Sequence, residues 1–114
     1  MVNLADREIQ PPRQKDFPPL SGDELETLTR EIDENWSVVD EHHLERRFTF
    51  KNFNDALDFT VQIGEVADTA DHHPEICLAW GKAKIIIWTH SVGGLSEADF
   101  VLAAKADRLY STTT

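Results

Sequence analysis

The spacing of apolar residues along the chain predicts three helices. Apolar side chains recur at helical intervals after Ser21, Asn52 and Ser96, which places them on one face of each segment. Each of these three residues is followed three positions later by an acidic residue, a spacing that is typical of helix N-termini. We therefore expect helices to begin near residues 21, 52 and 96.

Four shorter apolar segments between these helices have the length of strands. They cover residues 36–40, 44–50, 76–80 and 83–90. Glu41-His42-His43 connects the first two segments and Gly81 turns the last two, so each pair is interpreted as a hairpin. The order α-β-β-α-β-β-α contains no repeated parallel crossover. It predicts an α+β fold in which three helices cover one face of a four-stranded antiparallel sheet.

The N-terminal segment differs in character from the rest of the chain. Residues 1–20 contain four of the five prolines and show no apolar period. We expect a proline-rich arm or disordered tail there, part of which packs on the domain through Phe17 and Leu20. A single folded domain is expected over residues 21–114.

The last predicted strand is apolar on both faces. Ala83, Ile85 and Ile87 alternate with Ile86 and Trp88. One set can cover the helices, while the other is either an apolar contact surface on the open face of the sheet or part of an ordinary buried strand.

Composition and charge exclude several classes of protein. The net charge is −10, with 21 acidic against 11 basic residues, so we expect no binding to nucleic acid or to anionic membranes. No apolar run approaches the roughly 20 residues that a membrane span needs, and no hydrophobic signal core opens the chain. The single cysteine, Cys77, forms no internal disulfide and is expected to be an inert residue of the core. These features favour a cytoplasmic protein.

Three histidines carry the candidate chemistry. His72-His73 follow the second predicted helix, and His90 closes the last predicted strand. Histidine exchanges protons near neutral pH because its ordinary pKa is about 6.5. Two imidazoles on one loop and a third on a neighbouring strand suit a reaction that needs both an acid and a base.

Simpler interpretations of the same residues stay open at this point. The tandem histidines are equally typical of a helix C-terminus, where they interact favourably with the helix dipole. Three histidines also bind zinc in some proteins, but tandem ligands rarely point at one ion, so we expect no metal. Asp99 is explained by helix capping alone.

The spacing of these residues as a set is more specific than any one of them. The set consists of Asp68, His72-His73-Pro74, Trp80, His90 and Asp99. It resembles the signature of the pterin-4a-carbinolamine dehydratases, and Phe53-Asn54-Asp55-Ala56 is also similar to that family. The resemblance covers about residues 21–110.

The resemblance implies an activity that suits the residues. Family members remove water from 4a-hydroxytetrahydropterin to give quinonoid dihydropterin, which recycles the pterin cofactor of aromatic amino acid hydroxylases. The implied protein is a homodimer or homotetramer that uses no metal or other cofactor. The implied catalytic residues are His72, His73 and His90. The implied substrate-binding residues are Asp68, Asp71, Pro74, Thr89 and Asp99.

Some positions depart from the family pattern. Ile76 stands where many dehydratases have tryptophan, and Ala98 stands where mammalian members have a basic residue. The block from Ile87 to His90 resembles a bacterial and plastid branch. The resemblance implies that some members of this branch are RuBisCO assembly factors with little dehydratase activity. The alternative function is therefore a binding protein whose partner is the RuBisCO large subunit, as in carboxysome assembly, or another dimerisation partner.

Overall fold

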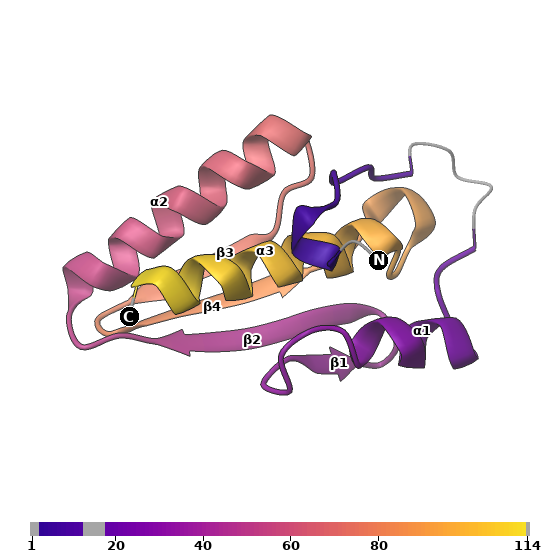
Figure 1. Cartoon of the computed structure of the whole chain (residues 1–114), viewed down its shortest axis with the longest axis horizontal. Helices are drawn as coiled ribbons and strands as arrows, with labels where there is room; N and C mark the ends of the chain where they lie inside the picture. The colour runs from indigo at the N-terminus through magenta and orange to yellow at the C-terminus, as the bar shows by residue number, and fades with distance from the viewer. Residues whose placement is uncertain (1–2, 13–17, 114) are drawn as a thin grey trace.

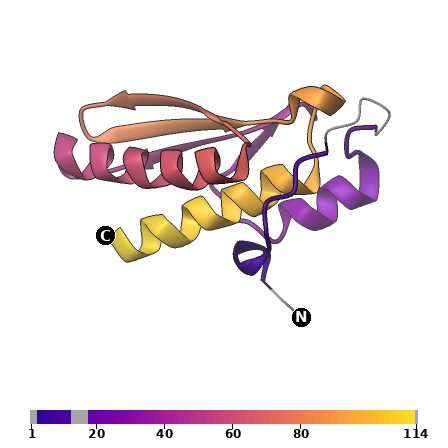
Figure 2. The same cartoon turned by 90° about the horizontal axis from the view of Figure 1, so that it is seen from above.

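The fold is an α+β arrangement of three helices and a four-stranded antiparallel sheet, as predicted (Figure 1). The computed structural model describes residues 3–12 and 18–113. Its elements are η1 (Leu4–Asp6), α1 (Gly22–Thr29), β1 (Ser37–Val39), β2 (His43–Thr49), α2 (Phe53–Ala70), β3 (Glu75–Ala79), β4 (Lys82–Ile87), η2 (His90–Val92) and α3 (Glu97–Thr113). The strand order is β1-β2-β4-β3. Seen from above, the helices lie on one side of the sheet (Figure 2).

The first hairpin turns one residue earlier than predicted. Asp40 and Glu41 both have positive φ, of 53° and 54°, and the His42 N–H donates to the Val39 carbonyl at 2.8 Å. Positive φ at both central residues is the geometry of a type I′ turn, whose twist matches that of paired strands. His43 consequently becomes the first residue of β2.

The core lies between the sheet and the helices. Ala83, Ile85 and Ile87 of the central strand β4 are fully buried on the helix side. On the open side, Ile86 is only half-buried, and its neighbours in the ladder are Glu45 and Glu75. Carboxylates therefore interrupt the apolar strip that the sequence suggests on this face.

Cys77 corrects a prediction from the sequence. It lies in β3 opposite Lys84, on the open face of the sheet, and is exposed rather than part of the core. Alternation in a strand places every second residue on the opposite face, and a one-residue error in phase reverses the assignment.

A buried ion pair ties α3 to the sheet. The Arg46 guanidinium in β2 is 7% exposed and donates to Asp107 Oδ1 at 2.6 Å. The Trp36 indole N–H donates to the same oxygen at 2.8 Å. Burial raises the pKa of Asp107, and the hydrogen bond from Trp36 and the charge of Arg46 act against that rise. Arg46 is therefore committed to the interior and does not contribute to a basic surface.

The first residues of the chain pack on the domain. Leu4 is 3% exposed within the core, and η1 lies beside α3 (Figures 1 and 2). Leu20 is half-buried, and its N–H donates to the Leu95 carbonyl at 2.8 Å. Phe17, the other expected contact, lies outside the described residues. None of the helices in the described ranges is long and apolar enough to cross a membrane.

Candidate active site

The C-terminus of α2 delivers the two tandem histidines. Helix α2 begins as predicted, with Asn52 Oδ1 accepting the Asp55 N–H at 2.8 Å. It ends at Asp71, which adopts the left-handed conformation with a φ of 54°. The His72 N–H then bonds back to the Ala67 carbonyl at 3.0 Å, which closes the helix end. This local geometry turns the chain so that consecutive histidines have different surroundings.

A short loop after β4 delivers the third histidine. The sequence predicts strand through residue 90, but β4 ends at Ile87, where its pairing with β2 also ends. Thr89 instead pairs with Gly94 across a small loop, with the Thr89 N–H donating at 2.8 Å. His90 lies in this loop, at the start of η2, and is exposed.

Asp99 connects the two segments. Its side chain is fully buried, and Oδ1 lies 2.6 Å from His72 Nε2. Oδ2 accepts the Thr89 hydroxyl and the Ser96 backbone N–H, each at 2.8 Å. Asp99 therefore caps α3, as its position predicts, and also holds a candidate site residue in place.

This contact determines which nitrogen of His72 is free. A carboxylate only accepts hydrogen bonds, so His72 Nε2 must carry the hydrogen. In the neutral ring, Nδ1 then has the lone pair. A carboxylate that fixes the tautomer and the ring orientation of a histidine is a recurrent device in functional sites.

His73 has a more open setting. Its side chain is 57% exposed, and Nε2 lies 3.1 Å from Asp68 Oδ1. Its Nδ1 lies 4.0 Å from Asp71 Oδ1. The two tandem histidines thus differ sharply, because one is fixed in the interior and the other is accessible to solvent.

The third histidine belongs to an aromatic stack. The ring of His90 is stacked on Trp88, with centroids 3.7 Å apart and planes at 24°. His42 packs against Trp88 at 4.4 Å, so the indole contacts two imidazoles. The sequence places His42 only in the connection between the first two strands. Its packing against Trp88 is a tertiary feature that no local pattern indicates.

These segments surround a cavity of about 440 Å³. Its lining residues are Pro11, Pro12, Asp71, His72, His73, Trp88, Thr89, His90 and Ser91. All three candidate catalytic histidines therefore line one space of a size that is typical of small-molecule sites.

The remaining predicted residues lie around this space. Asp99 is not part of the cavity lining but contacts His72 and Thr89, which are. Asp68 is likewise outside the lining and contacts His73, which is part of it. Pro74 is half-buried and is not part of the lining. Within the described ranges, no three His, Cys, Asp or Glu side chains are arranged to hold a metal ion.

The sequence analysis does not identify Pro11, Pro12 and Ser91 as site residues. The prolines belong to the N-terminal arm, far from the histidines in sequence, and they become neighbours only through tertiary packing. Ser91 directly follows His90, and this adjacency is the one feature of the sequence that could have identified it as a site residue.

Comparison with known proteins assigns most of the chain to one family. Residues 18–109 match the family model described as pterin 4 alpha carbinolamine dehydratase. A Rubrobacter xylanophilus protein is 52% identical over 96% of this chain and 100% of its own, and one from Alkaliphilus metalliredigens is 48% identical over 97% and 99%. Both bear the name pterin-4-alpha-carbinolamine dehydratase as a provisional assignment.

A solved structure has the same fold. The crystal structure of a transcriptional coactivator/pterin dehydratase from Brucella melitensis superimposes with a TM-score of 0.74 at 32% identity. The match covers 79% of this chain and 96% of that one. On the strength of the family model and of these relatives, this chain belongs to the pterin-4a-carbinolamine dehydratase family.

Proposed function

We propose that this protein dehydrates 4a-hydroxytetrahydropterin to quinonoid dihydropterin and thereby recycles the pterin cofactor of aromatic amino acid hydroxylases. The observation that carries the proposal is the single cavity that His72, His73 and His90 share. Membership of the dehydratase family supports the same reaction.

The reaction needs two proton transfers. A base removes the proton from N5, a double bond forms between N5 and C4a, and the C4a–O bond breaks. An acid protonates the departing hydroxyl, which leaves as water. Positioned side chains that give and take these protons typically accelerate such steps by roughly 10²–10⁴-fold.

The three imidazoles are suited to different parts of this work. His72 is fixed by Asp99 in the tautomer whose Nδ1 has a lone pair, the form that a base needs. His73 and His90 are exposed, so they can exchange protons with water between turnovers. We therefore propose His72 as the base and one of the other two as the acid, while Asp71 and Thr89 contact the pterin.

A direct assay tests this function. An aromatic amino acid hydroxylase generates the 4a-hydroxy compound, and quinonoid dihydropterin formation is followed with and without this protein. We expect clear acceleration over the spontaneous rate, with at least a 100-fold loss in His72→Ala, which lacks the proposed base, and nearly full activity in His43→Ala. His43 is a suitable control because it lies in β2 outside the cavity. No acceleration by the folded wild-type protein would refute the proposal.

The alternative, a RuBisCO assembly factor or other dimerisation partner, stays a prediction. It depends on an apolar sheet face around Trp88. In the described chain, that indole packs against His42 and His90 beside the cavity. No specific contact in the described residues favours this alternative over the enzyme.

A further inference from the structure

We propose that the N-terminal arm, defined here as residues 3–12, is part of the substrate site, and that Pro11 and Pro12 form a wall that contacts the pterin. This inference rests on the proposed dehydratase function. It goes beyond that function because it assigns a part in substrate binding to a segment that lies outside the histidine motif and outside residues 18–109, which the family model matches.

The end of the arm lies at the cavity itself. Pro11 and Pro12 are both half-buried and line the same space as the three histidines. Proline rings fix φ near −65°, so two consecutive prolines form a stiff segment. A stiff wall loses little conformational entropy when a ligand binds, and such preorganisation increases affinity.

A hydrogen bond joins this wall to the loop that contains a candidate catalytic residue. The Ser91 hydroxyl donates to the carbonyl oxygen of Pro12. Ser91 follows His90 in η2 and also lines the cavity. The position of the diproline is therefore fixed relative to His90.

The beginning of the arm is anchored on helix α3. Leu4 is buried in the core, and the Lys105 ammonium donates to the Ala5 carbonyl at 2.8 Å. Asp6 pairs with Arg108 at 2.7 Å. Burial of the Leu4 side chain, together with the polar contacts of the two residues that follow it, sets the register of the segment.

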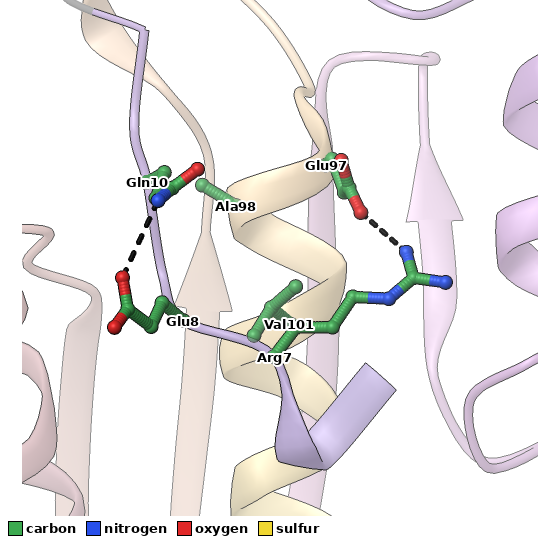
Figure 3. A pocket seen from close by; sticks show the side chains of 6 residues that line it. All are labelled: Arg7, Glu8, Gln10, Glu97, Ala98 and Val101. Carbon is green, nitrogen blue, oxygen red and sulfur yellow. Dashed lines mark hydrogen bonds and ion pairs between the residues drawn. The ribbon is translucent and has the colours of Figure 1, made fainter. Parts of the chain in front are cut away.

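The middle of the arm is held differently. A cavity of about 610 Å³ lies between the arm and the first turns of α3. Figure 3 shows Arg7 directed toward Glu97, with which it forms an ion pair, and Gln10 directed toward Glu8. Ile9, between these side chains, is half-buried and packs against the core cluster. The anchored start, Ile9 and the bond from Ser91 together determine where Pro11 and Pro12 lie.

The chemistry of the wall complements that of the rest of the site. A pterin is a flat heteroaromatic bicycle with an apolar face and polar edges. Proline ring carbons provide apolar surface for that face, whereas the imidazoles, Asp71 and Thr89 provide polar groups for the edges. A small-molecule site typically combines these two kinds of surface.

Steady-state kinetics and binding test the proposal on the full chain. The variant carries Pro11→Gly and Pro12→Gly together, which leaves Leu4 and the ion pairs of the arm in place. Pro18→Gly is the matched control, because Pro18 is exposed and is not part of the cavity lining. We expect the KM of the double variant, and its Kd for the non-reacting probe 7,8-dihydrobiopterin, to rise about tenfold. The kcat should stay within about twofold, because a wall binds substrate and transition state alike.

The outcomes separate this inference from the proposed function. An active wild-type enzyme whose double variant keeps the KM and Kd of the Pro18→Gly control would overturn the role of the arm and leave the dehydratase function standing. A wild-type protein that neither binds 7,8-dihydrobiopterin nor accelerates dehydration would overturn both. Thermal unfolding of the double variant should occur slightly below that of the control, because it carries one more proline-to-glycine change. The difference should be small, since neither proline belongs to the core cluster.

Discussion

At the scale of single residues, Asp99 is central because one carboxylate has two functions. It caps α3 through Ser96 and fixes His72 through its other oxygen. Capping chemistry predicts the first function from the sequence. The resemblance implies that Asp99 either orients an imidazole or binds the pterin, and it does not show that one carboxylate both caps the helix and fixes His72. The distance of 2.6 Å to His72 is a tertiary fact, since 27 positions separate the two residues along the chain.

Because Asp99 fixes the tautomer of His72, Asp99→Asn should change it. An amide can donate its N–H to His72 Nε2, which favours the tautomer with the hydrogen on Nδ1 and removes the lone pair from that atom. We expect kcat/KM for dehydration to fall by roughly 100-fold or more. Imidazole ¹⁵N shifts of His72 should report the change in tautomer. An unchanged tautomer together with full activity would contradict the role given to Asp99.

The difference in burial between His72 and His73 predicts different effects on stability. His73→Ala should change the free energy of unfolding by less than about 0.5 kcal/mol, because its side chain is 57% exposed. His72→Ala should cost about 1–3 kcal/mol, since it leaves the buried oxygen of Asp99 without its partner. Urea unfolding measures both values, and equal losses in the two variants would argue against the described geometry.

At the scale of elements, the sequence predicts the order and type of the helices and strands better than their ends. Alternation in 44–50 and the helical faces after Asn52 and Ser96 are strong local signals, and the elements are present. The last strand ends three residues early, where its pairing with β2 ends at Leu44 opposite Ile87, and the sequence of a single strand cannot show where pairing ends. Ser21 is the N-cap of α1, but its side chain makes no capping bond.

The contact of α3 with the sheet predicts a large loss of stability from one substitution. Asp107→Ala removes the close carboxylate partner of the buried Arg46 guanidinium, which keeps the longer ion pair with Asp33, at 3.5 Å, and its contact with the Phe48 ring. It also leaves the Trp36 N–H without its acceptor. We expect a loss of about 3 kcal/mol in the free energy of unfolding. The control Arg30→Ala breaks an exposed pair with Glu26 and should cost less than about 0.5 kcal/mol. Similar small losses in both variants would contradict the account of the core.

At the scale of the whole molecule, the sequence analysis separates an arm from a domain, and the structure describes how part of the arm packs. The composition of residues 1–20 distinguishes them from the rest of the chain, because their proline content and their lack of apolar periodicity are local features of the sequence. No such signal reveals that Leu4 enters the core or that Pro11 reaches the histidines. Contacts between distant segments depend on the folded surface and are not specified by local patterns.

The expected homo-oligomer leads to a prediction about α2. Phe53, Leu57 and Val61 are spaced four residues apart on one face of this helix and are 42%, 37% and 50% exposed. We expect copies of the chain to associate through this face, because burial of apolar surface favours association. Light scattering should give a mass above 13.0 kDa for the wild-type protein and a lower oligomer for Leu57→Lys. Thr69→Lys, at an exposed position on a different face of the same helix, is the control, and equal masses for both variants would refute this interface.

The central claim is that the pterin binds in the cavity that the three histidines line, and a binding map tests it most directly. Side-chain ¹⁵N signals of all five histidines are followed by NMR while 7,8-dihydrobiopterin is added to the full chain. The account predicts saturable shifts at His72, His73 and His90, the three histidines of the cavity lining, with smaller shifts at His43. Shifts confined to other surfaces, with these three signals unchanged at saturation, would contradict it.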